Sequence, residues 1–122
     1  MRKETRKYLC SELLRYQHSL DELRIIRRKI AVIQKRQSAY NPELEYLLTR
    51  KRMLETITNG INDVCHELDD DLLNLAKLKF FAHKPRLSDY EIMQHVACSK
   101  SNYYYKIAKI CSMLAKRIGM DT

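Results

Sequence analysis

The chain has 122 residues, of which 45% are hydrophobic, and a formal net charge of +8 at pH 7. With only two Gly and two Pro it has too few breakers for an all-β chain of many turns, so we expect the all-α class. The length allows one domain, or one small domain with a long helical extension. No apolar run approaches the roughly 18 residues of a membrane span, so no membrane partner is expected.

The charges are distributed unevenly along the chain. Residues 1–40 carry eleven Lys or Arg and four acidic residues, residues 41–70 carry three and seven, and residues 71–122 carry nine and four. Basic surface favours approach to a polyanion such as nucleic acid, but a simply solvated surface explains the charge equally well. The four cysteines form no CxxC pair and the MRKETRK start lacks a following apolar region, so we expect reduced thiols and a cytoplasmic location.

Two long apolar rows predict an N-terminal helical hairpin over residues 1–68. The first row predicts one helix of about 35 residues from Arg2 to Gln37, because apolar residues recur at steps of three and four without Gly or Pro. Asn41 then suits an N-cap and Pro42 a first helical turn. The second row contains Asn59-Gly60, which is a kink, a helix end or a tolerated glycine. Dimerisation through the same rows is the competing arrangement. The two rows are Leu9, Leu13, Tyr16, Leu20, Leu23, Ile26, Ile30 and Ile33, then Leu44, Leu47, Leu48, Lys51, Leu54, Ile57, Ile61, Val64 and Leu68.

A second unit is expected over residues 69–122. The acidic triplet Asp69–Asp71 suits the N-terminus of a third helix, whose buried side is drawn from Leu72, Leu73, Leu75, Ala76, Leu78, Phe80 and Phe81. A loop follows at His83–Arg86, because Pro85 disfavours helical geometry for the residue before it. Ser88 and Glu91 then match a capping box that begins a short helix with Ile92, Met93 and Val96 on its apolar side.

Ser99 caps another helix only eleven residues after Ser88, and its inner side is expected to hold Tyr103, Ile107, Ile110 or Cys111, and Leu114. Two capped helices joined by so tight a turn are typical of a helix-turn-helix that places its second helix in the major groove of duplex DNA. With Tyr103 and Ile107 turned inward, we expect base contacts from Lys100, Ser101, Asn102 and Tyr105. Phosphate contacts are expected from Lys84, Arg86, Ser88, Ser99, Tyr104, Lys106 and Lys109.

The segment SDYEIMQHVACSKSNYYYKIAKICSMLAKRIG resembles the sigma-factor region-four type of helix-turn-helix, and the resemblance covers residues 72–119. Glu91-Ile92 match the first helix, Ser99 the cap, Tyr103-Tyr104 an aromatic pair, and Leu114-Ala115 with Gly119 the closing motif. Ala97 departs from a frequent glycine, and Cys98 from an aliphatic residue. Among users of this module the chain is most similar to phage and phage-satellite late-gene regulators of the RinA, ArpU and LtrC kind. That resemblance implies a late-gene activator in a bacterial host cell, with host RNA polymerase as a further partner.

The sequence gives weaker support to other sites and functions. The sequence indicates no enzyme, cofactor or metal site: His95, Cys98 and Cys111 lack a fourth paired ligand, and neighbouring Cys65 and His66 diverge on a helix. One alternative function is a protein-interaction module whose hairpin engages RNA polymerase or a small modulator protein. Another is nonspecific nucleic-acid binding by the basic N-terminal residues. A homodimer through the N-terminal helices also stays open.

Overall fold

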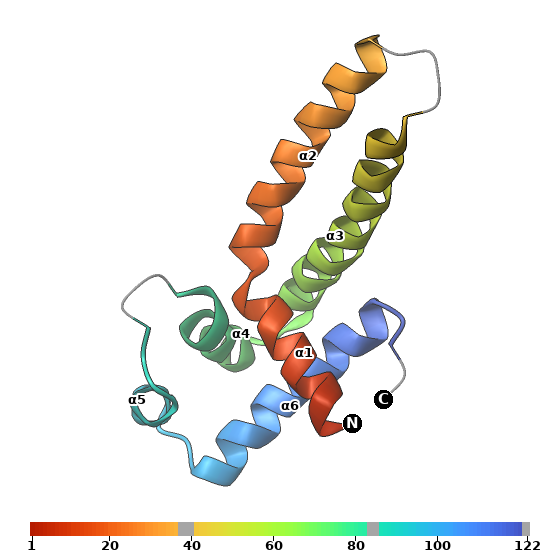
Figure 1. Cartoon of the computed structure of the whole chain (residues 1–122). Coiled ribbons are helices and arrows are strands. Elements are labelled where there is room, and N and C mark those ends of the chain that lie inside the picture. The colour runs from red at the N-terminus through yellow and green to blue at the C-terminus, as the bar shows by residue number, and fades with distance from the viewer. Residues whose placement is uncertain (37–40, 83–85, 121–122) are drawn as a thin grey trace.

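The computed structural model describes residues 1–36, 41–82 and 86–120, and these residues are helices and their connections (Figure 1). The all-α class is therefore confirmed for the described residues. The helices are α1 (Lys3–Leu14), α2 (Tyr16–Arg36), α3 (Pro42–Glu67), α4 (Asp70–Ala76), α5 (Asp89–His95) and α6 (Lys100–Arg117), with a π-helical turn η1 (Lys77–Phe81) directly after α4.

The prediction of one helix from Arg2 to Gln37 is wrong, because the helix breaks at Arg15. This residue has φ −96° and ψ 9°, and it separates α1 from α2. The two helices have different partners: α1 lies against α6 and η1, whereas α2 lies antiparallel to α3 (Figure 1). Tyr16, the first residue of α2, packs on Phe81 of η1 with ring centroids 5.6 Å apart. One straight helix could not reach both sets of partners.

The apolar residues form two separate cores. The smaller one joins α2 and α3 through Leu23, Ile26, Ile30, Leu47 and Leu54. The larger one surrounds α6 and includes residues on both sides of the boundary expected at positions 68 and 69. Its buried members are Leu9 and Leu13 of α1, Ile61 and Val64 of α3, Leu68, and residues of α4, η1, α5 and α6.

Gly60 lies inside an unbroken α3, so of the three interpretations of Asn59-Gly60 the tolerated glycine is the one observed. The glycine is buried where α3 crosses α6. A Cβ atom at this position would lie 2.7 Å from Cγ2 of Ile118 and 3.3 Å from Cδ1 of Leu114. The missing side chain therefore allows the two helices to approach closely.

The predicted helix starts are confirmed by their hydrogen bonds. The Asn41 side chain accepts from the amides of Glu43 and Leu44, and Pro42 occupies the first turn of α3. Asp69 accepts from the amide of Leu72 at 2.8 Å. Local side-chain chemistry thus sets where α3 and α4 begin.

Candidate nucleic-acid interface

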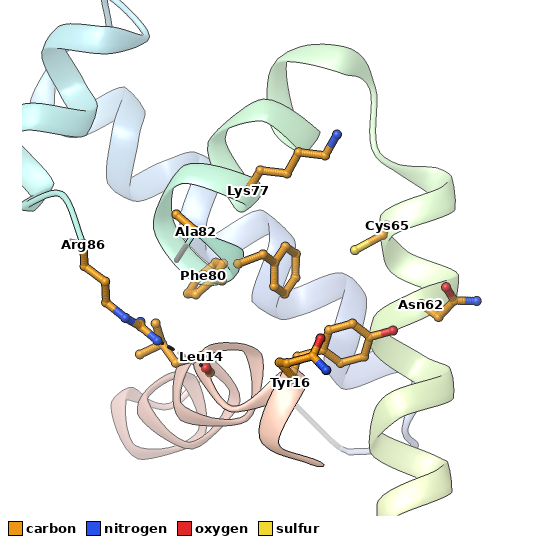
Figure 2. A pocket seen from close by; sticks show the side chains of 10 residues that line it. Leu14, Tyr16, Asn62, Cys65, Lys77, Phe80, Ala82 and Arg86 are labelled. Carbon is orange, nitrogen blue, oxygen red and sulfur yellow. Dashed lines mark hydrogen bonds between the residues drawn. The ribbon is translucent and has the colours of Figure 1, made fainter. Parts of the chain in front are cut away.

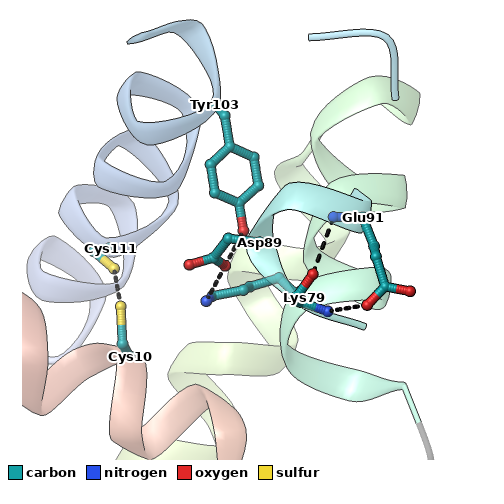
Figure 3. A network of polar contacts seen from close by, with 7 residues as sticks. Cys10, Lys79, Asp89, Glu91, Tyr103 and Cys111 are labelled. Carbon is teal, nitrogen blue, oxygen red and sulfur yellow. Dashed lines mark hydrogen bonds and ion pairs between the residues drawn. The ribbon is translucent and has the colours of Figure 1, made fainter. Parts of the chain in front are cut away.

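Helix α5 begins with the predicted capping box. Glu91 donates its backbone amide to the Ser88 hydroxyl at 3.2 Å, and the Ser88 amide donates to the Glu91 carboxylate at 3.0 Å (Figure 3). These bonds lower the pKa of the Glu91 carboxyl. The carboxylate therefore stays ionised at the helix N-terminus, where the positive end of the helix dipole favours a negative charge.

The connection from α5 to α6 is a Schellman motif followed by a new cap. The Cys98 amide donates to the Met93 carbonyl at 3.0 Å and the Ala97 amide to the Gln94 carbonyl at 3.3 Å. Ala97 has φ +49°, in the left-handed region where glycine is favoured. Ser99 then accepts from the amide of Asn102 at 3.2 Å and begins α6. Ala97 therefore stands at the one residue of the turn that needs a positive φ, where the helix-turn-helix pattern frequently has glycine.

The inner side of α6 is buried as predicted. Tyr103, Ile110, Cys111 and Leu114 are at most 1% exposed and Ile107 is 5% exposed. Ile92 of α5 is fully buried, whereas Val96, the residue after α5, is only partly buried against the same core. Helix α6 is thus fixed along one side, and its orientation determines which side chains reach solvent.

The four residues predicted to contact bases are all exposed. Ser101, Asn102 and Tyr105 share one side of α6, because they are three and four residues apart, and Lys109 continues this row one turn later. Lys100 lies in the first turn, three residues before Tyr103, so it projects from a different side of the helix. The structure therefore groups Ser101, Asn102, Tyr105 and Lys109, which we name the outer row of α6.

The residues predicted to contact phosphates do not form one group. Ser88, Ser99 and Lys109 are exposed, Lys106 is half-buried, and Lys84 lies outside the described residues. Tyr104 packs edge-on against Tyr103 at 5.1 Å and lines a small cavity with Arg6 and Lys79, beside α1.

Arg86 lies apart from the outer row. Its guanidinium donates to the Leu14 carbonyl at 3.5 Å, at the edge of a cavity of about 480 Å³ between η1, α3 and the start of α2 (Figure 2). Tyr16, Phe80 and Phe81 contribute their rings to this cavity.

The sequence did not lead us to predict a role for Lys116. This residue is exposed and follows Lys109 by seven residues, a spacing that places it on the same side of α6.

A polar network fixes α5 relative to α6. Asp89 Oδ1 accepts from Lys79 Nζ and from the Tyr103 hydroxyl, both at 2.6 Å (Figure 3). Partial burial raises the pKa of Asp89, but the bonds from Lys79 and Tyr103 outweigh it and leave the pKa below its ordinary value. Burial and the Asp89 carboxylate raise the pKa of Tyr103. Sequence reasoning assigned Tyr103 to the core without anticipating this bond.

A pair of thiols also joins α1 to α6. The Sγ atoms of Cys10 and Cys111 lie 3.5 Å apart (Figure 3). The hydrogen bond with Cys111 lowers the pKa of Cys10 to about 7, with help from Lys79 and Arg6. Cys111 was expected in the core and is buried there, but its partner on α1 lies far away in sequence.

The described residues contain no group of three or more His, Cys, Asp or Glu side chains placed to hold a metal ion. Among them, no helix has both the length and the apolar content needed to cross a bilayer. Comparison of the chain with known protein families, curated proteins and solved structures gave no match. The function is therefore inferred from the geometry and chemistry of α5 and α6.

Proposed function

We propose that the chain is a sequence-specific transcription regulator in which α5 and α6 form a helix-turn-helix that binds duplex DNA. The observation that carries this proposal is the exposed outer row of α6, opposite an inner side anchored by Tyr103 and Ile107. Asn102 can pair with adenine N6 and N7, and Ser101 and Tyr105 can donate or accept. Lys109 and Lys116 supply positive charge along the same side for phosphates.

The surroundings of α6 support binding to an anion. The negative charge of Asp89 is offset by its ion pair with Lys79. The hydroxyls of Ser88 and Ser99 accept from amides and can still donate to a phosphate oxygen at two neighbouring helix starts.

The regulatory context of the proposal comes from the sequence resemblance. The resemblance to late-gene regulators of the RinA, ArpU and LtrC kind supports a target among late genes of a phage or phage-related element, with activation through host RNA polymerase. The hairpin of α2 and α3 is then available to a second protein.

The test uses the full chain and duplexes selected from a random library, with affinity measured by fluorescence anisotropy at fixed salt. We expect Asn102→Ala to lose about 1–3 kcal/mol of binding to the selected site, and Lys109→Ala to weaken binding to all duplexes. Gln34→Ala and Lys35→Ala are matched controls, because both residues are exposed at the end of α2, near the hairpin tip. If the first two variants bound like the wild type, the recognition-helix assignment would be wrong.

Point substitutions suit this chain better than a truncation to residues 70–122. That fragment lacks Leu9, Leu13, Ile61 and Val64, which are at most 1% exposed in the core around α6. Removing them would expose the inner side of α6 to water, so loss of binding by the fragment would not separate folding from recognition.

A further inference from the structure

Large apolar side chains remain exposed on the three N-terminal helices. Tyr8 of α1, Ile25 and Val32 of α2, and Tyr46 and Met53 of α3 are 44–66% exposed. Apart from Met1, they are the exposed large hydrophobic residues within the described part of residues 1–67. None of them belongs to the buried core between α2 and α3.

These five residues lie on the same side of the hairpin as the ion pair between Arg50 and Glu22. Arg50 binds Glu22 through two hydrogen bonds of 2.8 and 3.1 Å. Ile25 follows Glu22 by three residues, and Val32 follows Ile25 by seven, so both lie near Glu22 around the helix axis. By the same spacing, Tyr46 and Met53 lie seven residues apart on α3 and flank Arg50.

Two shallow cavities confirm this placement. Tyr8 and Met53 line one of them together with Arg50. Val32 lines the other with Lys29 and Glu43, nearer the hairpin tip. The opposite side of the hairpin carries a separate ion pair between Arg27 and Glu55. We name the side with Tyr8, Ile25, Val32, Tyr46 and Met53 the apolar face.

The apolar face has the spacing of a helix-packing surface. On α2, the positions on this side recur at alternating steps of four and three residues: His18, Glu22, Ile25, Lys29, Val32 and Arg36. Such a row remains on one side along a helix that packs against another helix. The inner row of α2 already faces α3, so this second row is available to a different molecule.

The charges on the apolar face indicate which molecule it fits. Near the tip, α2 contributes Lys29 and Arg36 and α3 contributes Glu43, and none of the three forms an ion pair with another described residue. A twofold rotation about an axis parallel to the hairpin lays α2 of one copy on α3 of the other, so basic residues face acidic ones. A twofold axis across the hairpin would instead lay α2 on α2 and α3 on α3, so Lys29 would not have Glu43 of the other copy opposite it.

We propose that the apolar face pairs with the same face of a second copy of this chain about a twofold axis parallel to the hairpin, forming a four-helix bundle. Each helix then has antiparallel neighbours, as in other four-helix bundles. Helix α6 lies at the end of the molecule away from the hairpin tip (Figure 1). The dimer therefore presents two copies of α6 at the same end, as recognition of a site with two half-sites requires.

Sedimentation equilibrium of the full chain without DNA tests association independently of the proposed function. We expect the wild type to be a dimer at about 10 μM, and Val32→Glu to raise its dissociation constant at least about tenfold. Ala31→Glu is the matched control. It adds the same charge one residue away, at an exposed position four residues after Arg27 and so on the opposite side.

We expect Ala31→Glu to dimerise like the wild type, with both variants keeping the wild-type helical circular dichroism. A wild type that stays monomeric up to about 100 μM would overturn the proposal and leave the face to a different protein. Equal weakening by Val32→Glu and Ala31→Glu would overturn it as well.

A mixing experiment tests the orientation of the two copies. Lys29→Glu and Glu43→Lys should each weaken the homodimer, because each places like charges across the interface twice. In a heterodimer of the two variants, one of the two contacts keeps the native Lys29 and Glu43. The other contact combines both substitutions, so its charges are again opposite but exchanged between the helices. The heterodimer should therefore form with near wild-type affinity. If each change weakened the homodimer and mixing restored nothing, the placement of α2 on the partner's α3 would be wrong.

Discussion

The unit around α6 and the hairpin of α2 with the first half of α3 bury their apolar residues in different ways. Around α6, residues from α1, α3, α4, η1 and α5 converge on one helix, and most of its inner side chains are fully buried. In the hairpin, two helices share a single row of five buried residues, which are 3–6% exposed.

This difference is consistent with the two roles proposed for these regions. A helix held from several sides keeps a fixed orientation, which a base-reading surface needs. A two-helix hairpin can bury only one side of each helix and leaves the others to solvent or to a partner. We therefore associate precise positioning with the α6 unit and association with the hairpin.

Core truncation should give the largest difference between the two regions. We expect Leu114→Ala, in the α6 unit, to lower the free energy of unfolding by about 4 kcal/mol, and Leu47→Ala, in the hairpin, by about 2 kcal/mol. Leu114 is fully buried between helices that cannot all move inward, whereas α2 and α3 can close around a smaller side chain. Urea unfolding followed by circular dichroism measures both, and equal losses would contradict the comparison.

Removing a polar side-chain contact should give a smaller difference in the free energy of unfolding, again with the larger loss in the α6 unit. Asp89→Ala leaves the buried Tyr103 hydroxyl without its acceptor and should cost about 2 kcal/mol. Glu22→Ala removes the partner of Arg50, whose side chain is 32% exposed and can bind water instead, and should cost about 1 kcal/mol or less. The two substitutions are compared by urea unfolding at pH 7. A larger loss of stability in Glu22→Ala would show that the hairpin depends more on its Glu22–Arg50 ion pair than the α6 unit depends on the contacts of Asp89.

The Asp89 effect should also depend on pH. Because the folded-state pKa of Asp89 is depressed, its contribution to stability is fully present above the ordinary carboxyl value of 3.8 and is lost as the pH falls through the folded pKa. The stability gap between the wild type and Asp89→Ala should therefore shrink below about pH 4. A gap that stayed constant from pH 7 to pH 3 would show that the charge of Asp89 contributes nothing.

A small effect should come from the two turns that end α5 and α6. Both are Schellman motifs, but Ala97 holds the left-handed position after α5 with φ +49°, and Gly119 holds it after α6 with φ +77°. We expect Ala97→Gly to raise stability by about 1 kcal/mol by relieving this strain, and Gly119→Ala to lower it by a similar amount. A Cβ at Gly119 would meet nothing within 4 Å, so its cost is conformational.

Thermal unfolding measures both turn substitutions. Opposite signs are the expected result, and a loss of stability in Ala97→Gly would show that the alanine side chain contributes more by packing than it costs in backbone strain.

Local features of this protein were predictable from its sequence. Asn41, Asp69, Ser88 and Ser99 cap their helices through their own side chains, so a few neighbouring residues suffice to indicate each start. The 3.6-residue period likewise identified the buried side of α6, and with it the exposure of Ser101, Asn102 and Tyr105.

Tertiary packing decided the features that depend on distant residues. No Gly or Pro marks the break at Arg15, which follows from the different partners of α1 and α2. Arg86 reaches the Leu14 carbonyl, and Cys10 meets Cys111, only because α1 folds back onto the α6 unit. Helix caps and apolar periods act over one or two turns, whereas these contacts join residues 72 and 101 positions apart. Which of several apolar surfaces a helix buries is settled by the partners that the whole fold brings to it.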